Sequence, residues 1–233
     1  MSACVRFLCA GAAQGLVKAL EPRFLADSGA ALQGRFGAVG AMKEALLAGE
    51  PCDVMVATEA MIDALCAQGH LRADTRATLG HVFTGMAVRA GSRHPDTATA
   101  SGLKAALLAA DAVYFPDAVR ATAGIHFAGV MRSLGILEAL EPRLHTYPAG
   151  AIAMRELAAS AAINPLGCTQ VSEILYTPGV ELVSLLPPEY ELATVYTAAV
   201  GVGALQPALA ARFVATLSGA DSVLLRRTDG FVV

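Results

Sequence analysis

The chain has 233 residues, of which 55% are hydrophobic, and a formal net charge of −3 at pH 7. This length is enough to bury a large core, either as one big domain or as two lobes of roughly 100 residues each. Asp and Glu outnumber Lys and Arg by 20 to 17, which excludes a strongly basic surface of the kind that binds nucleic acid. Charged residues also recur too often for an 18-residue membrane-spanning helix.

Strand-like and helix-like stretches alternate along the chain, which is the pattern of parallel strands covered by helices. The predicted strands are 3–10, 32–36, 52–57, 112–115, 143–147, 163–169 and 180–185. The predicted helices are 13–27, 40–48, 59–68, 101–109, 123–134, 150–161, 171–174 and 206–217. We predict an α/β fold with one lobe formed by 1–80 plus 200–233, a second lobe formed by 85–190, and crossings near 81–88 and 191–200.

The cysteines and the N-terminal residues indicate a reducing compartment. Five cysteines without a CxxC pair favour neither a disulfide framework nor a thiolate zinc site. The first predicted strand begins at residue 3, where a secretory signal would carry a basic start and a long apolar stretch. We therefore expect a cytoplasmic protein, or a periplasmic one if a signal peptide has been removed, and no metal.

Three predicted strands lead into loops of small residues that open helices. The loops are Gly11–Gly15, Phe36–Met42 and Thr122–His126. A helix that begins in such a loop leaves its first backbone N–H groups unpaired, at the positive end of the helix dipole. Such a start suits an anion, so we expect these loops to converge in a cleft on one small, negatively charged ligand.

These loops belong to a wider resemblance that covers nearly the whole chain. The sequence resembles the molybdate-binding type of periplasmic solute-binding proteins, in the blocks Phe7–Ala13, Phe36–Met42, Leu47–Val54, Ala123–Ala128 and Pro165–Gly167. The most specific block is Ala48–Asp53, with its Ala-Gly-x-Pro-x-Asp pattern. The resemblance implies a two-lobed, periplasmic-binding-protein-like (flytrap) architecture of type 2, with the ligand in the cleft.

The same family implies ligand contacts that this chain has in part lost. Family members hold an oxyanion with a serine hydroxyl in each of the first two loops and a tyrosine in a later loop, where this chain has Gly11, Val39 or Gly40, and Gln170. The missing hydroxyl donors argue against molybdate. The predicted ligand contacts are Gly11, Ala12, Ala13, Val39, Gly40, Arg120, Thr122, Ala123, Thr169, Gln170 and Tyr196.

Some of these side chains also have plain structural interpretations. Arg120, beside a helix start, would grip a carboxylate in bidentate fashion, or it is a solvated loop residue. Gln170 donates to the anion or pins its loop, and Tyr196 points into the crossing or packs as a structural tyrosine. Glu173, near a short predicted helix, would supply a carboxylate base, or it is a helix-surface charge without a special role.

Two residues are candidates for acid–base chemistry. Cys168, at a predicted strand end facing positive helix termini, would have a lowered pKa and act as base or nucleophile, or it is a buried small apolar residue. His126, in the first turn of its helix, would move a proton, or it packs between helix and sheet.

Two functions remain open. The first is a cofactor-independent isomerase of a small di- or tricarboxylate, because aconitate isomerases are similar to molybdate-type binding proteins. Its chemistry is an allylic proton shift. The alternative is the binding protein of an ABC transporter for molybdate or another small oxyanion or organic anion. Neither a phosphate-binding loop nor a dinucleotide fingerprint is present, so no cofactor is expected.

Overall fold

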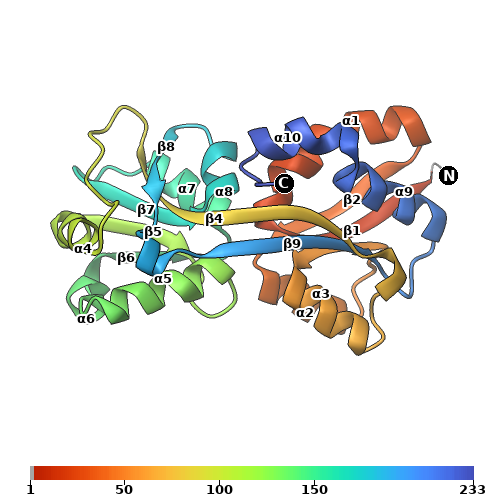
Figure 1. The fold of residues 1–233 in the computed structure, drawn as a ribbon, viewed down its shortest axis with the longest axis horizontal. Helices are drawn as coiled ribbons and strands as arrows, with labels where there is room; N and C mark the ends of the chain where they lie inside the picture. The colour runs from red at the N-terminus through yellow and green to blue at the C-terminus, as the bar shows by residue number, and fades with distance from the viewer. Residues whose placement is uncertain (1–2) are drawn as a thin grey trace. The chain divides into compact units, whose positions relative to one another are not determined.

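The structure is a computed structural model that describes residues 3–233. The chain divides into two compact units, and the second of them is Phe83–Ala193. The first unit consists of the chain up to Val82 together with Thr194–Val233. The chain leaves the first unit within strand β4 (Ala77–Arg89) and returns within β9 (Ala193–Val200), the two long strands of Figure 1.

Three parallel strands form the framework of the first unit. These are β1 (Cys4–Ala10), β2 (Ala31–Gly37) and β3 (Val54–Thr58), in the order β2-β1-β3, and β9 pairs antiparallel with β3. Since parallel strands end at one edge of a sheet, the helices that follow them begin along this edge. They are the 3₁₀ helix η1 (Gly11–Ala13) with α1 (Gln14–Ser28), then α2 (Val39–Leu47) and α3 (Glu59–Ala67).

Helices cover both faces of this unit. Figure 1 shows α1, α9 (Pro207–Ser218) and α10 (Val223–Thr228) on one side of the strands, and α2 and α3 on the other. Phe213 of α9 lies between Phe24 of α1 and Phe7 of β1, with ring centroids 5.1 and 6.5 Å away. Two short 3₁₀ helices, η2 (Ala73–Thr75) and η5 (Ala220–Ser222), complete the unit.

The sequence block with the Ala-Gly-x-Pro-x-Asp pattern ends on a buried ion pair of the first unit. The Asp53 carboxylate is fully buried and accepts three hydrogen bonds from Arg6, through its backbone N, Nε and Nη2, at 2.7–3.0 Å. The backbone N of Leu205 donates a fourth, at 2.8 Å. Burial alone would raise the pKa of Asp53, but these donors outweigh it and hold the pKa below its usual value.

The second unit repeats the plan of parallel strands followed by helices. β5 (Ala112–Pro116) lies between β6 (Leu144–Tyr147) and β7 (Pro165–Gln170), all parallel. β4 pairs antiparallel with both β7 and β8 (Val180–Leu185). The helices are α4 (Ala100–Ala109), α5 (Thr122–Ser133), α6 (Leu137–Leu140), α7 (Gly150–Ala158) and α8 (Val171–Tyr176), with the 3₁₀ helices η3 (Glu141–Arg143) and η4 (Pro188–Tyr190).

Strand β5 separates the two hydrophobic cores of this unit. Val113 and Phe115 belong to a cluster with α4, α5 and α6, whereas Ala112 and Tyr114 belong to a cluster with α7 and α8. Alternate side chains of a strand point to opposite faces, which explains this division. In Figure 1, α5 and α6 accordingly lie on one side of β5, and α7 and α8 on the other.

The predicted strands and helices are all present, and the strand predicted over 180–185 has the predicted ends, whereas the ends of most others are shifted. The largest shift is in the first crossing segment, where β4 already begins at Ala77. The strand predicted over 163–169 instead begins at Pro165. Within residues 3–233, no single helix has the length and composition to span a membrane, although the bent pair Pro207–Ser218 and Ala220–Thr228 passes on those two criteria together.

Candidate functional site: helix starts at the strand ends

In the first unit, two helix starts of small residues lie next to each other. Ala10 of β1 pairs in register with Gly37 of β2, so η1 and α2 begin side by side. The residues before them, Ala10 and Ala38, provide no side-chain cap, whereas Thr58 accepts a hydrogen bond from Met61 N and caps α3. The first N–H groups of α2 therefore meet no side-chain cap and suit an anion.

The predicted contacts of this unit sit at this edge or beside it. Gly11, Ala12 and Ala13 form the buried η1, and Val39 and Gly40 are the first two residues of α2. Tyr196, by contrast, is 2% exposed and packs edge-on against Phe231, with ring centroids 6.3 Å apart. This packing matches its structural interpretation, and its contact with ligand stays a prediction.

The start of α1 already holds a carboxylate of the chain itself. Asp229, just after α10, accepts a hydrogen bond from the backbone N of Leu16 at 3.0 Å. Burial raises the pKa of Asp229 to about 7, although the bond from Leu16 opposes this. No sequence signal indicated this contact, because the two residues are 213 positions apart.

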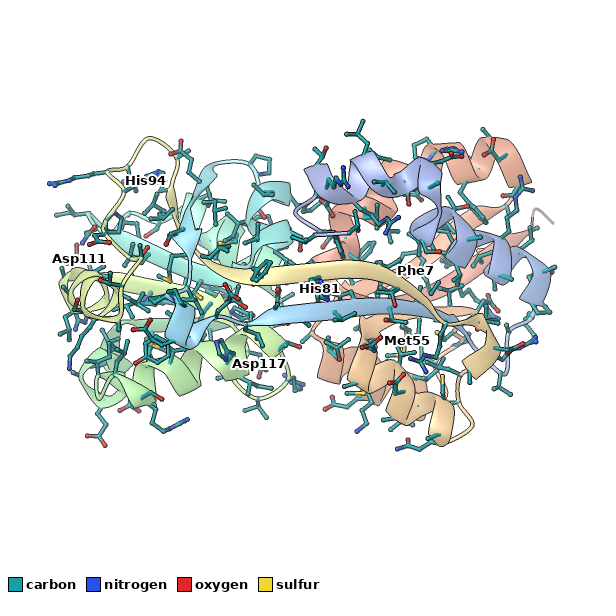
Figure 2. All side chains as sticks on the ribbon, viewed as in Figure 1. Phe7, Met55, His81, His94, Asp111 and Asp117 are labelled. Carbon is teal, nitrogen blue, oxygen red and sulfur yellow. The ribbon has the colours of Figure 1, made fainter. Side chains whose placement is uncertain are left out.

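In the second unit, the loop before α5 is organised around Asp117, which is labelled in Figure 2. Its Oδ1 accepts hydrogen bonds from the backbone N of Val119 and Arg120, at 2.7 and 3.0 Å. Its Oδ2 accepts Nε and Nη2 of Arg120, at 3.1 and 2.9 Å. Burial would raise the pKa of Asp117, but these donors lower it. The guanidinium predicted to grip a ligand carboxylate thus holds a carboxylate of its own loop.

The start of α5 has no side-chain cap, and its backbone packs closely against the end of β5. Its cap residue, Ala121, offers no side-chain acceptor, and Thr122 and Ala123 are the first two residues of the helix. A Cβ on Gly124 would collide with the carbonyl oxygens of Pro116 and Asp117. Only glycine permits this close approach of the helix to the end of β5.

A buried carboxylate occupies the start of α7. Glu173 of α8 is 5% exposed and accepts the hydroxyl of Thr169 at 2.5 Å and the backbone N of Ala151 at 3.3 Å. Burial raises the pKa of Glu173, against the opposing effect of Thr169 and of the backbone amides of Ala151, Gly150 and Gln170. The interpretation of Glu173 as a helix-surface charge is wrong, because α8 packs against α7.

This pairing limits what the β7–α8 junction offers to a ligand. Thr169 is fully buried and gives its one hydroxyl proton to Glu173, so its side chain has none left for an anion. Gln170 is the N-cap residue of α8, is 2% exposed and forms contacts within the chain. Ligand binding by both residues stays a prediction.

The two candidate acid–base residues have different surroundings. Cys168 is fully buried in the hydrophobic cluster of β5 and α5, and burial raises the pKa of its thiol. The expected lowering of this pKa is wrong, because the side chain points into the core. His126 is half-buried, and its Nε2 lies 2.7 Å from the carbonyl oxygen of Tyr190. Because a carbonyl only accepts, Nε2 donates, which leaves Nδ1 with a lone pair in the neutral ring.

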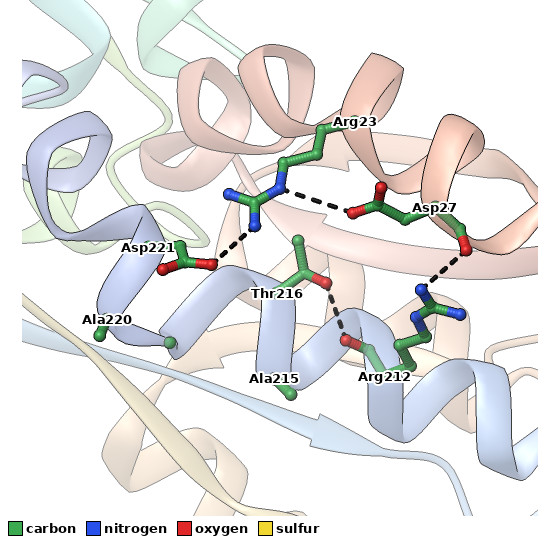
Figure 3. Close-up of a pocket in the computed structure, with 8 residues that line it drawn as sticks. Arg23, Asp27, Arg212, Ala215, Thr216, Ala220 and Asp221 are labelled. Atoms are coloured by element: carbon green, nitrogen blue, oxygen red, sulfur yellow. Dashed lines mark hydrogen bonds and ion pairs between the residues drawn. The ribbon is translucent and has the colours of Figure 1, made fainter.

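Elsewhere in residues 3–233, a hollow and the metal-ligating side chains are further candidate sites. Figure 3 shows a hollow in the first unit where Arg23 pairs with Asp221 at 2.7 Å and Arg212 donates to the carbonyl oxygen of Asp27 at 2.7 Å. Both guanidinium groups are bound by the chain's own acceptors, so we assign no ligand to it. Among residues 3–233, no three His, Cys, Asp or Glu side chains gather to hold a metal ion.

Comparison with known proteins adds a family and several relatives. Residues 5–232 match the family model described as bacterial extracellular solute-binding protein. A relative described as aconitate isomerase, from a Pseudomonas species, is 26% identical over an alignment of 224 residues that covers 92% of this chain and 82% of the relative.

Two solved structures illustrate the likeness in fold. The periplasmic molybdate-binding protein of Azotobacter vinelandii has a TM-score of 0.80 at 20% identity, covering 98% of this chain and 99% of its own. The sulfate-binding protein SubI of Mycobacterium tuberculosis H37Rv has a TM-score of 0.76 at 15% identity, covering 98% and 86%.

These matches confirm the predicted α/β, two-lobed periplasmic-binding-protein-like fold class and the resemblance to molybdate-binding-type proteins. The expectation of a cytoplasmic protein finds no support among them. The family model describes extracellular proteins, and the molybdate-binding relative is periplasmic, which is consistent with the periplasmic alternative.

Proposed function

This chain belongs to the bacterial extracellular solute-binding protein family, and from that premise we propose that it binds a small carboxylate-bearing anion through main-chain amides at its helix starts. The observation that carries the proposal is the set of cap residues without side-chain acceptors, Ala10, Ala38 and Ala121, at the carboxyl ends of parallel strands. Amides at such starts favour a negative charge.

The side chains around these starts support a carboxylate over a tetrahedral oxyanion. A dianionic tetrahedral ion needs donors on all sides, yet the positions of the family's serines hold Gly11 and Val39 or Gly40, and Thr169 gives its proton to Glu173. A planar carboxylate needs fewer donors. The relative described as aconitate isomerase agrees with this ligand class.

Binding is tested by placing a competing carboxylate at one helix start. Ala38→Asp would put an acceptor on the first N–H groups of α2, which keeps the helix capped and repels an anionic ligand. We expect at least a tenfold weaker Kd by calorimetry for the best ligand among citrate, cis-aconitate, trans-aconitate, sulfate, molybdate and tungstate, with Tm maintained.

Two variants control for size and for charge. Ala38→Ser adds a neutral side chain at the same place, and we expect it to keep most of the affinity. Gln206→Asp adds the same charge at the N-cap of α9, which follows the antiparallel strand β9 and not β1 or β2, and we expect wild-type binding. Equal affinity of Ala38→Asp and wild type would refute the proposal, and so would a Tm rise with molybdate or tungstate alone.

The second candidate is a cofactor-independent isomerase, favoured by the aconitate isomerase relative. An allylic shift needs a base that removes a methylene proton and an acid that protonates the former alkene carbon. The buried, high-pKa Cys168 is poorly suited, so the better candidate is His126, with its lone pair on Nδ1. We keep both residues in the test.

Proton NMR of cis- and trans-aconitate in deuterated buffer separates binding from catalysis. For an isomerase we expect interconversion with deuterium uptake, lost in His126→Ala while Kd changes little, and retained in Cys168→Ser. Binding without any interconversion would leave the solute-binding function alone. Full activity in His126→Ala would remove the histidine from the mechanism.

A further inference from the structure

The start of α7 differs from that of α5 because a carboxylate from another helix of the same unit occupies it. The cap residue of α7, Ala149, has no side-chain acceptor, as at α5. At α7, however, the carboxylate of Glu173 accepts the Ala151 amide at 3.3 Å and the Thr169 hydroxyl at 2.5 Å. The buried carboxylate thus accepts hydrogen bonds from backbone N–H groups that have no partner within the helix.

Glycine at position 150 gives this carboxylate its space. A Cβ at that position would overlap both the Glu173 carboxylate and the Thr169 hydroxyl. Gly150, Thr169 and Glu173 therefore fit one another as a set, contributed by α7, β7 and α8. The set is buried, which makes the loss of any one partner costly.

We propose that Glu173 is an internal anion that fills the start of α7, positions the β7–α8 junction and keeps this helix start closed to external anions. The proposal does not depend on which solute the protein binds. Its consequence is that an anion site opens at α7 when the carboxylate is removed. The ligand class of that site follows from the missing atoms, because Glu173→Ala deletes a group with the heavy atoms of an acetate ion.

The test is chemical rescue, without the protein's own solute. Unfolding of wild type, Glu173→Ala and Glu156→Ala is followed at pH 7 with sodium acetate, sodium chloride of equal ionic strength, or acetamide. Glu156 lies on α7 itself and is exposed, so its replacement by alanine is the matched control. We expect acetate alone to stabilise Glu173→Ala, with about a tenfold rise in the folding equilibrium constant at ten times its Kd.

Each outcome decides the proposal. Stabilisation of Glu173→Ala by acetate, with none by acetamide and none in the other two proteins, supports it. Equal effects of acetate on Glu156→Ala or wild type, or no effect on a folded Glu173→Ala, overturn it.

Should Glu173→Ala fail to fold, Glu173→Gln decides instead, because it places an NH₂ group among N–H donors. We then expect at least a tenfold loss in folding equilibrium constant relative to Glu156→Gln, and equal stability would overturn the proposal.

Discussion

Replacing Asp229 by Asn should change how stability depends on pH. In the wild type the Asp229 carboxylate lies against the start of α1, and burial raises its pKa from 3.8 to about 7. Between about pH 4 and 7 the folded protein therefore keeps a proton that the unfolded chain has lost. By linkage, the free energy of unfolding falls as pH rises through this range and levels off above it.

The structure sets the size of the effect. A pKa of about 7 instead of 3.8 corresponds to about 4 kcal/mol at ~1.4 kcal/mol per pKa unit. Because the side chain is only half-buried, solvent screening reduces this to about 2 kcal/mol. Asn keeps an oxygen for the Leu16 amide and carries no charge. The neighbouring Cys9 adds no charge beside Asp229, because burial raises the pKa of its thiol and keeps the thiol neutral.

Urea unfolding followed by circular dichroism, from pH 4 to pH 8, measures the difference. We expect Asp229→Asn to match the wild type near pH 4 and to exceed it by about 2 kcal/mol at pH 8. Asp221→Asn, exposed in the same C-terminal segment, should stay within about 0.5 kcal/mol at both. A difference between Asp229→Asn and wild type that is the same at pH 4 and pH 8 would refute the raised pKa.

Two further predictions concern stability. Gly124→Ala should destabilise the protein by about 1–3 kcal/mol, because the added methyl group meets two backbone carbonyls that cannot move aside. Gly129→Ala in the same helix has open space and should stabilise it by about 0.5–1 kcal/mol, so equal values in thermal unfolding would contradict the reasoning. Asp53→Asn should cost about 3 kcal/mol at pH 7, because it leaves Arg6 without its charge partner. The lowered pKa of Asp53 means that its contribution is present above about pH 4 and fades in acid, so the gap to wild type should narrow there in urea titrations.

The local pattern of the sequence was enough to predict the elements. Alternating apolar runs and small-residue loops indicated β1, β2 and β5 and the helices after them, because side-chain periodicity and turn chemistry act over a few residues. The sequence block that ends at Asp53 indicated the family. The hydrogen bonds that the Asp53 carboxylate accepts from Arg6 and Leu205 could not be predicted from this block.

For the candidate site, too, the features set by local sequence could be predicted, whereas those set by tertiary contacts could not. The open starts at Val39 and Thr122 were predictable, since they depend on which residues follow a strand. The assignments that rested on electrostatics were not. The sequence suggests an activated thiol at Cys168, but this side chain lies in a hydrophobic core. It suggests a base or a surface charge at Glu173, but this carboxylate is the buried partner of Thr169.

The sequence by itself therefore determined the order of strands and helices, the fold class and the helix starts without side-chain caps. Only the tertiary structure decided which starts are filled from within, by Asp229 at α1 and Glu173 at α7. The reason is that a secondary-structure element is set by its own residues, whereas the burial and charge of a side chain are set by neighbours that the fold brings from elsewhere in the chain.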